Sequence, residues 1–548
     1  MTVIPIPDRF ECAFTPPYAR QCAADRSICE NLRAGSRALL VNPGNLRETR
    51  GMTGRFRAAQ GDRVLLGLRE FFGREPVTTV QSDRAEEKLL GLFQRAARDV
   101  PAYRRFLEQH GISAASVSDL AAFRRLPVTT KDNYYRPNPL ADLCWHGALD
   151  ACDMVALSTG STGEPAAWPR SASDELVTSE RFEQVLDAFG ARERRTLAVI
   201  CFALGNWVGG LYTLACCRHL AAKGYPITVI APGNNPAEIL RALRVMSGHY
   251  DQRVLFGYPP FVKDMVDAAL AEGIDLSSPP TRLVFAGEVF SEQWRDWVSS
   301  RVGSLDPSRS TASLYGTADG GVLGNETPLS IQIRRALAEH PDAARALFGE
   351  PRLPTLCQYD PEHRYFEVED GWLLFSGDGG APLLRYKILD RGGIVGFREM
   401  QRFLSDHGVE LSGGYTGPEL PFVFVFGRSS FAVSYYGANV YPENVAVGLE
   451  QPELASSLTG KFVLQVLTDS SQDVFLDLKV ERARGLPNAA NSGPSSATIA
   501  AQVRGQLERL NSEFKNYVPA ARRDPRVELR SFEDPEYFPR GVKHRYTR

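Results

Sequence analysis

The spacing of apolar residues predicts two helices near residue 100. Across residues 85–110 apolar positions recur every three or four residues, which is the helical period. Pro101 suits the first position of a helix, because its missing N–H would have no partner there in any case. We therefore expect one helix to end just before Pro101 and a second to begin at it.

Further along the chain, short apolar runs alternate with helical stretches. The runs are ITVIAP from Ile227, RVLFGYPP from Arg253 and RLVFAGE from Arg282. A stretch with helical spacing, residues 236–246, lies between the first two. This alternation predicts an α/β fold with a mostly parallel sheet and helices on both of its faces.

The pattern changes after Gly427. A helix-like PENVAVGLEQ is followed by two strand-like runs, KFVLQVLTD and VFLDLKVERA, then by a helical stretch over 497–517 and a last strand RVELRSF. We therefore expect a large α/β domain over residues 85–426 and a small α+β domain over 427–548. Residues 1–84 are treated as an N-terminal extension whose role the sequence does not indicate.

An uncharged segment, residues 196–217, is long enough to cross a membrane. It is interrupted by Gly205-Asn206 and by Gly209-Gly210, and its first half is short and β-branched. A buried strand, a turn and the start of a helix is therefore the favoured interpretation. Asn206, Trp207 and Gly209 would then lie at the carboxyl end of a strand, where open α/β sheets bind ligands.

Composition and charge narrow the range of functions. The chain has 548 residues, a net charge of −2 and 43% apolar residues, typical of a globular protein of more than one domain. This balance gives no basic surface for nucleic acid or for an anionic membrane. The nine cysteines include no CxxC pair, and the N-terminus has no secretion signal, so we expect reduced thiols in a cytoplasmic protein.

The stretch LSTGSTGEPAAWP, from Leu157, has a composition that cannot build a core. Its hydroxyls and backbone N–H groups surround glycines, which allow close backbone approach to an oligophosphate. The residues concerned are Ser158, Thr159, Gly160, Ser161, Thr162 and Gly163. The segment lacks the GxxxxGK[ST] pattern of a Walker A loop, and a flexible Ser/Gly linker remains an equal alternative on these residues alone.

Further segments follow this loop in a fixed order. They are AGEVF from Ala286, LYGTADGG from Leu314, PLLRYKILD from Pro382, GRSSFAVSYYGANVYPENV from Gly427 and PRGVKHRYTR from Pro539. RAARDVPAYRRFLEQHGI and LPVTTKDNYY precede the loop. In this combination the chain resembles the adenylate-forming superfamily of acyl-CoA synthetases, adenylation domains and luciferases. Within it the chain is most similar to the phenylacetate–coenzyme A ligase branch, over residues 85–548.

The resemblance implies nucleotide-binding roles for the matched positions. The Ser158–Pro165 loop would hold the β- and γ-phosphates of ATP, and Ala286, Gly287 and Glu288 would run along the adenine. Tyr315 would stack on the base, with Gly316 and Thr317 beside it in the same segment. Asp390 would accept hydrogen bonds from the ribose hydroxyls, and Arg428 would lie near the ribose and phosphate.

The same resemblance implies the catalytic groups and two half-reactions. A substrate carboxylate would attack the α-phosphate of MgATP, with Mg²⁺ on Asp319 and the Lys543 ammonium stabilising the developing charge. The small domain would then rotate about a hinge at Ser430, and a nucleophile would attack the activated carbonyl. Coenzyme A is the acceptor in the most similar branch, whereas biosynthetic relatives use an amine or a carrier protein; the sequence leaves this choice open.

The chain departs from the family pattern in three places. Glu164 replaces a common lysine in the loop, Ala318 replaces a threonine or serine, and Ser430-Phe431 replaces an acidic pair at the hinge. A nucleotide-binding homologue that has lost catalysis is therefore one alternative, and a purely structural or interaction protein is another.

The substrate is a small carboxylic acid in this interpretation. The positions expected to contact it are Asn206, Trp207, Gly209 and Tyr258. Aromatic side chains at strand ends favour an aromatic or planar acid, although aromatic residues at such places more often belong to the core. No nucleic-acid or membrane partner is expected.

Overall fold

The computed structural model describes residues 68, 71–73, 82–158, 166–349, 353–411, 414, 417–428, 432–455, 457–483, 494–539 and 546–547. Two helices near residue 100 confirm the first expectation: α3 is Ser82–Asp99 and α4 is Pro101–Gln109, with Pro101 in the first turn of α4. Val100 between them is fully buried, so the residue at the break between the two helices packs into the core. The short helix α5, Leu120–Arg124, follows.

The large sheet has eleven strands in the order β10-β11-β12-β13-β9-β8-β7-β6-β5-β3-β4. Its parallel part contains β3 (Thr196–Ile200), β4 (Ile227–Ile230), β5 (Gln252–Gly257), β6 (Thr281–Ala286) and β7 (Thr311–Thr317). These include the strands that the apolar runs predicted. The α/β fold class is therefore confirmed.

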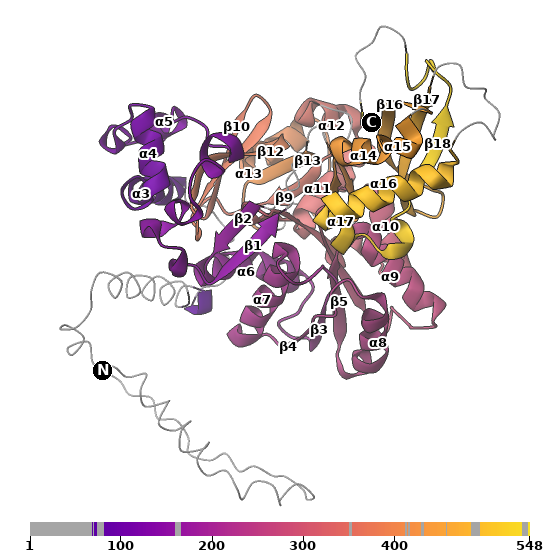
Figure 1. The fold of residues 1–548 in the computed structure, drawn as a ribbon. Coiled ribbons are helices and arrows are strands. Elements are labelled where there is room, and N and C mark those ends of the chain that lie inside the picture. Colours follow the sequence, from indigo (N-terminus) through magenta and orange to yellow (C-terminus); the bar gives the residue numbers. More distant parts are fainter. Residues whose placement is uncertain are drawn as a thin grey trace, which may run out of the picture. The chain divides into compact units, whose positions relative to one another are not determined.

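Helices cover both faces of this parallel part (Figure 1). Ala198 and Ile200 of β3 pack with α6 (Ala172–Ala188) and α7 (Val208–Lys223), whereas Leu197 and Val199 belong to the cluster of the opposite face. That cluster includes α8 (Pro236–Met246), α9 (Pro259–Ala271) and α10 (Glu292–Arg301). Because successive strand residues point to opposite faces, a strand covered on both sides must be apolar throughout.

The uncharged segment 196–217 is β3, a turn and the first part of α7, as expected. Packing requires a glycine at one of these positions, Gly210, because a Cβ there would lie 2.3 Å from the backbone oxygen of Ala203. Among the described residues, no helix has the length and apolar character needed to cross a membrane.

The rest of the large sheet is antiparallel, an arrangement that the sequence pattern did not specify. It contains β8 (Gly321–Asn325), β9 (Thr355–Gln358), β10 (Arg364–Glu369), β11 (Trp372–Gly377), β12 (Leu383–Val395) and β13 (Phe422–Arg428). The helices α11 (Pro328–Glu339), α12 (Pro341–Phe348) and α13 (Phe397–Asp406) contribute to a smaller core with β9 and β13. A separate hairpin, β1 (Met154–Ser158) and β2 (Ala166–Arg170), flanks the Ser/Gly loop.

The C-terminal elements include the expected strands and helices. The elements are the hairpin β14 (Val433–Tyr435) and β15 (Ala438–Val440), the helices α14 (Pro442–Leu449), α15 (Pro452–Ala455), α16 (Ser496–Leu510) and α17 (Ser512–Tyr517), and the sheet of β16 (Leu458–Thr468), β17 (Val474–Arg482) and β18 (Arg526–Arg530). The sequence pattern did not predict β14, β15 and α15. The helix expected over 497–517 is divided at Asn511, whose side chain accepts a hydrogen bond from the Phe514 N–H and so caps α17.

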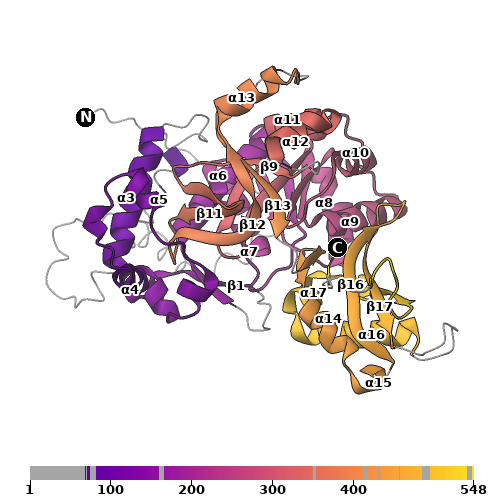
Figure 2. The ribbon, with the colours of Figure 1, turned by 90° about the horizontal axis from the view of Figure 1, so that it is seen from above.

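These C-terminal elements pack against α9 (Figure 2). The Tyr436 hydroxyl donates to Asp264 over 2.8 Å, and one buried cluster joins side chains of β5, α9, β14 and α16. By its contacts the chain divides into Met1–Ala58 and Ala59–Arg548, so both predicted domains belong to the second unit. The boundary at 427 stays a prediction.

Candidate active site

The carboxyl ends of the parallel strands bring together most of the predicted site. Trp207 follows β3, Tyr258 follows β5, Ala286 ends β6, and Tyr315 lies near the end of β7. Parallel strands end at the same edge of a sheet, which explains why residues about 50 to 100 positions apart meet there. The Leu157 N–H donates to the Asn206 carbonyl over 3.0 Å, which attaches the β1–β2 hairpin to the same edge.

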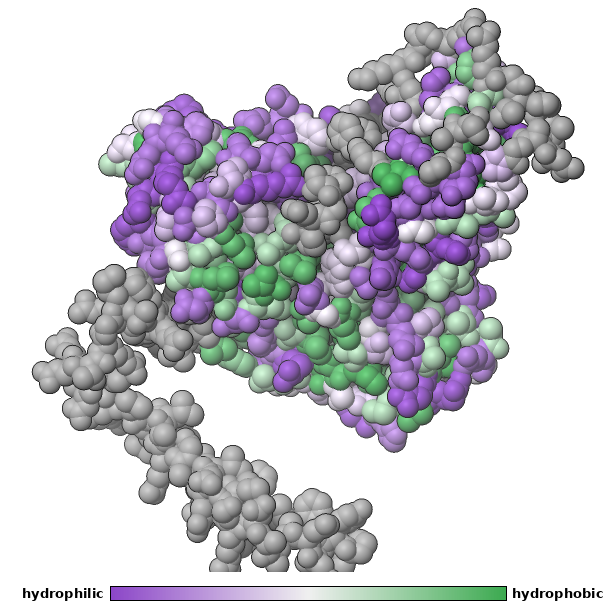
Figure 3. Space-filling view, viewed as in Figure 1, coloured by the Kyte–Doolittle hydropathy of each residue, from purple (hydrophilic) through white to green (hydrophobic). Residues whose placement is uncertain are grey.

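The β1–β2 hairpin holds the two ends of the Ser/Gly loop side by side. Ser158 pairs with Ala166, and its Oγ accepts a hydrogen bond from Trp168 Nε1 over 2.9 Å. Apolar surface gathers around this hairpin and α7 in Figure 3, whereas α3 to α5 are mostly polar. The other predicted loop residues, Thr159, Gly160, Ser161, Thr162 and Gly163, lie outside the described residues, as does Glu164.

Asp319 is the centre of a buried polar cluster. Its side chain is 3% exposed, and one carboxylate oxygen accepts from the Tyr386 hydroxyl over 2.8 Å. Lys131 Nζ lies 3.8 Å from the same oxygen. Arg170 Nη2 donates to the backbone oxygen of Asp319 over 2.7 Å and also to that of Ala318. The carboxylate is therefore held next to two cations.

Lys131 links this cluster to the hairpin. Its Nζ lies 5.2 Å from the centre of the Trp168 ring, a cation–π distance, and Trp168 in turn donates to Ser158. The Lys131 ammonium and the Arg170 guanidinium thus lie near the base of the Ser/Gly loop, so an anion bound by that loop would have positive charge nearby.

Tyr315 and Asp390 form a second buried pair. The Tyr315 hydroxyl donates to Asp390 Oδ2 over 2.8 Å, and the two residues are 8% and 5% exposed. Asp390 lies on β12 opposite Arg428 of β13. Gly316 has no room for a side chain, since a Cβ would lie 2.9 Å from the Gly321 oxygen, and Thr317 Oγ1 accepts from the Gly320 N–H. The base-stacking role of Tyr315 stays a prediction.

Glu288 and Tyr258 contact the C-terminal elements. The Glu288 carboxylate accepts a hydrogen bond from the Gly437 N–H in the β14–β15 turn. Burial raises the pKa of Glu288 to about 7. The Tyr258 ring stacks on Tyr517 with centres 5.3 Å apart, and a Cβ at Gly437 would lie 2.2 Å from the Tyr258 ring. Only glycine permits this approach.

The remaining predicted substrate positions lie next to this contact. The Trp207 ring meets Tyr517 edge to face with centres 4.9 Å apart, and a Cβ on Gly209 would be 3.9 Å from the Tyr258 hydroxyl oxygen. Trp207 and Tyr258 are both partly buried and pack against a core cluster, and their contact with a substrate stays a prediction.

Two predicted positions of the C-terminal part, the hinge Ser430 and the lysine Lys543, lie outside the described residues, and so does Phe431. The sequence interpretation also missed Lys131, Arg170, Tyr386, Gly437 and Tyr517. All but Tyr517 lie in or next to the motif segments quoted above. The charged and tyrosine side chains in and around those segments were therefore the signal from which these site residues could have been found.

No family model matches the chain. In sequence it is 24% identical to the phenylacetate–coenzyme A ligase of Thermus thermophilus over 394 residues, which are 70% of this chain and 78% of that protein. In structure it is similar to a 2-hydroxyisobutyryl-CoA ligase, solved with 2-HIB-AMP and CoA in the thioesterification state. The TM-score is 0.60 at 16% identity, covering 86% of this chain and 90% of the other.

An amide bond synthetase from Marinactinospora thermotolerans also matches, with a TM-score of 0.42 and 14% identity over 87% of this chain and 96% of the other. The sequence match to the phenylacetate–coenzyme A ligase agrees with the order of motifs along the chain, and the match to the 2-hydroxyisobutyryl-CoA ligase agrees with the α/β sheet. The chain therefore has the fold of the adenylate-forming ligases, and its resemblance to their phenylacetate–coenzyme A ligase branch is confirmed.

Proposed function

We propose that the protein is an adenylate-forming ligase, which activates a carboxylic acid with ATP and transfers the acyl group to coenzyme A or another nucleophile. The observation that carries this proposal is the meeting of the β1–β2 hairpin with the buried Asp319 cluster at the carboxyl ends of the parallel strands. The paired ends of the Ser/Gly loop support a phosphate loop over a linker, since a linker has no reason to close on itself.

The described residues suggest how each part of ATP is bound. Asp390 accepts hydrogen bonds from the ribose, with the Tyr315 hydroxyl holding its other oxygen. Lys131 and Arg170 add positive charge toward the phosphates. The buried Asp319 carboxylate suits Mg²⁺, a hard cation that takes one or two carboxylates together with phosphate oxygens and water. Bound there, Mg²⁺ would neutralise charge on the phosphates.

Several assignments rest on the motifs alone. We propose that the Thr159–Gly163 loop holds the phosphates, that Lys543 acts on the α-phosphate during adenylation, and that Ser430 is the hinge between domains of residues 85–426 and 427–548. An aromatic or planar acid is the proposed substrate class, because Trp207, Tyr258 and Tyr517 place three aromatic rings beside the strand ends.

The acceptor is proposed to be coenzyme A. The Gly437 turn contacts Tyr258 and Glu288, and the structurally similar 2-hydroxyisobutyryl-CoA ligase was solved with CoA in its thioesterification state. An amine or a carrier protein is the competing acceptor. We also propose a cytoplasmic location; the six cysteines among the described residues carry free thiols, as a reducing compartment would maintain.

A panel of carboxylic acids screened by ATP–pyrophosphate exchange tests the proposal. Exchange that depends on one class of acid is expected, and the best acid is then assayed with coenzyme A and with amines. ATP binding without exchange for any acid would favour a homologue that has lost catalysis. No ATP binding in calorimetry would overturn nucleotide chemistry altogether.

A further inference from the structure

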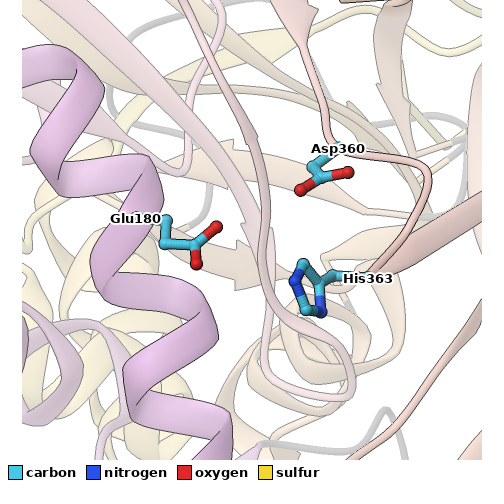
Figure 4. A group of neighbouring side chains, drawn as sticks. All are labelled: Glu180, Asp360 and His363. Atoms are coloured by element: carbon cyan, nitrogen blue, oxygen red, sulfur yellow. The ribbon is translucent and has the colours of Figure 1, made fainter. Parts of the chain in front are cut away.

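Three side chains that could bind a metal ion meet, and none of them is among the residues predicted for the ligase site. Glu180 lies in the middle of α6, Asp360 follows β9, and His363 lies in the turn before β10. Glu180 projects from its helix toward the other two (Figure 4). One ligand atom from each residue lies within 4.8 Å of the others. None of the three belongs to the motifs that resemble the adenylate-forming ligases.

Asp360 is the most informative member of this cluster. It is 3% exposed, and its Oδ1 accepts a hydrogen bond from the Glu362 N–H over 2.9 Å. Its Oδ2 is buried and receives no hydrogen bond from any part of the chain that the structure describes. A buried carboxylate oxygen without a donor is costly, because the charge has lost its water and gained nothing in return.

None of the nearby cations that the structure describes donates a hydrogen bond to Asp360 Oδ2. Arg364 lines the same space, but its guanidinium donates to the backbone oxygens of His363 and Asp378. Arg181 Nη2 lies 3.9 Å from Glu180 Oε2, which is an ion-pair distance and too long for a hydrogen bond. Glu362 is directed toward Arg84 and Lys88.

The cluster surrounds a space of the size of a single ion. A cavity of about 10 Å³ is lined by Glu180, Asp360 and His363. A second cavity of about 620 Å³ shares Glu180 and His363 with it. Three protein ligands, with water in the fourth position, are the usual ligand set of catalytic zinc sites.

We propose that Glu180, Asp360 and His363 bind a divalent transition-metal ion, with Zn²⁺ as the best match. An imidazole disfavours Mg²⁺ and Ca²⁺, and two carboxylates disfavour Cu(I). Ligand atoms around a tetrahedral Zn²⁺ lie roughly 3.4 Å apart, so the side chains need to close by about 1 Å on binding. The ion would tie α6 to the β9–β10 turn, independently of the proposed ligase activity.

Metal titration of the full-length chain tests this proposal. Protein treated with a chelator is titrated with Zn²⁺ in a calorimeter, in wild type, Asp360→Asn and His363→Gln. His340→Gln is the matched control, since His340 is exposed at the end of α11. We expect one Zn²⁺ ion per chain in the wild type and in the control. The affinity for Zn²⁺ should be lower by more than about 100-fold in the two cluster variants, a larger loss than is typical of residues that only orient a ligand.

Cobalt spectroscopy separates this cluster from the thiols. Cys144 Sγ and Cys152 Sγ lie 3.9 Å apart and would bind a soft ion. Co²⁺ bound to the proposed ligands should give visible d–d bands without a thiolate charge-transfer band. This measurement needs only the wild-type protein, so it tests the proposal even if a variant does not fold. A thiolate band, equal affinity in His363→Gln, or no bound ion in the folded wild type would overturn the proposal.

Discussion

Asp319 and Asp390 are both buried carboxylates near the strand ends, and their neighbouring groups differ. We propose different ligands for them, Mg²⁺ for Asp319 and the ribose for Asp390. Asp319 has a lysine ammonium 3.8 Å away and a tyrosine hydroxyl at 2.8 Å, within a cationic surrounding. Asp390 has a tyrosine hydroxyl on one oxygen. Each hydrogen bond fixes the carboxylate's orientation before any ligand arrives, so little ordering is left to be done on binding.

Asp390→Asn tests the ribose contact. The amide keeps one acceptor but adds a donor that faces the hydroxyls, so AMP affinity should fall by ~1.5–3 kcal/mol, as for a hydrogen bond to a charged group. Calorimetry with AMP measures it. Tyr315→Phe is the matched variant, since it removes only the hydroxyl that holds Oδ2. Equal weakening of a 2′,3′-dideoxy nucleotide would show that Asp390 does not contact the sugar.

Glu288 predicts a pH dependence of stability. Its pKa is raised to about 7 by burial, so between its ordinary value near 4.5 and 7 the folded state holds a proton that the unfolded state releases. Stability should therefore fall as pH rises through that window, by about 1–3 kcal/mol, and level off above it.

Urea denaturation midpoints from pH 4.5 to 8 measure this slope. Because other groups titrate in the same range, the quantity to compare is the difference between wild type and Glu288→Gln, which keeps the acceptor for the Gly437 N–H but has no proton to lose. Parallel profiles for the two proteins would exclude Glu288 as the source.

At the scale of elements, short hairpins rather than long helices complete the site. The β1–β2 hairpin carries Trp168 and Arg170 toward Asp319, and the β14–β15 turn brings Gly437 onto Tyr258 and Glu288. The φ of Gly437 is +82°, so two constraints act on one residue: a left-handed backbone and direct contact with an aromatic ring.

Gly437→Ala tests the importance of this turn. Gly460 also has a φ of +82°, but a Cβ added there would have no atom within 4 Å, so Gly460→Ala is the matched control for backbone strain alone. Both should lose about 1–2 kcal/mol of unfolding free energy from the left-handed backbone, and Gly437→Ala about 1–3 kcal/mol more from overlap with Tyr258. If the proposed ligase activity is correct, transfer from acyl-AMP should also slow in Gly437→Ala only.

Equal unfolding free energies for the two variants would mean that the turn does not pack on Tyr258 in solution. Unchanged acyl transfer in a destabilised Gly437→Ala protein would leave the packing in place and remove the turn from the reaction.

At the scale of the whole molecule, the C-terminal elements are attached to α9 through one buried apolar cluster and several polar contacts. Lys263 of α9 pairs with Asp473, and Arg522 Nη2 lies 3.3 Å from Asp264 of α9, which also accepts a hydrogen bond from Tyr436. The polar contacts can be exchanged at modest cost, but a domain rotation would also have to separate the shared apolar cluster. The proposed hinge and the proposed Lys543 role both depend on such a rotation.

Lys543→Ala tests the two-conformation scheme. If this lysine acts only during adenylation, acyl-AMP formation should fall by about 10²–10³ whereas transfer from pre-made acyl-AMP is spared. The two half-reactions are measured separately. Loss of both would indicate that Lys543 holds the C-terminal part together, and loss of neither would make the motif at the chain end irrelevant to catalysis.

The sequence by itself determined the elements whose physics is local. Apolar runs such as those of β3 and β5 identify strands buried on both faces, and Pro101 identifies a helix start, because these signals depend on near neighbours. The ordered motifs likewise identified Asp319 and Asp390 as candidate site residues without knowledge of any tertiary contact.

Only the tertiary structure decided which distant residues meet. The antiparallel order of β8 to β13, the 75-residue separation between Tyr315 and Asp390, and the contact of Tyr517 with Trp207 leave no periodic signal in the chain. The same holds for Glu180, which lies on α6 while Asp360 and His363 follow β9. Such meetings result from how helices and strands pack around shared cores, and that packing depends on the whole chain at once.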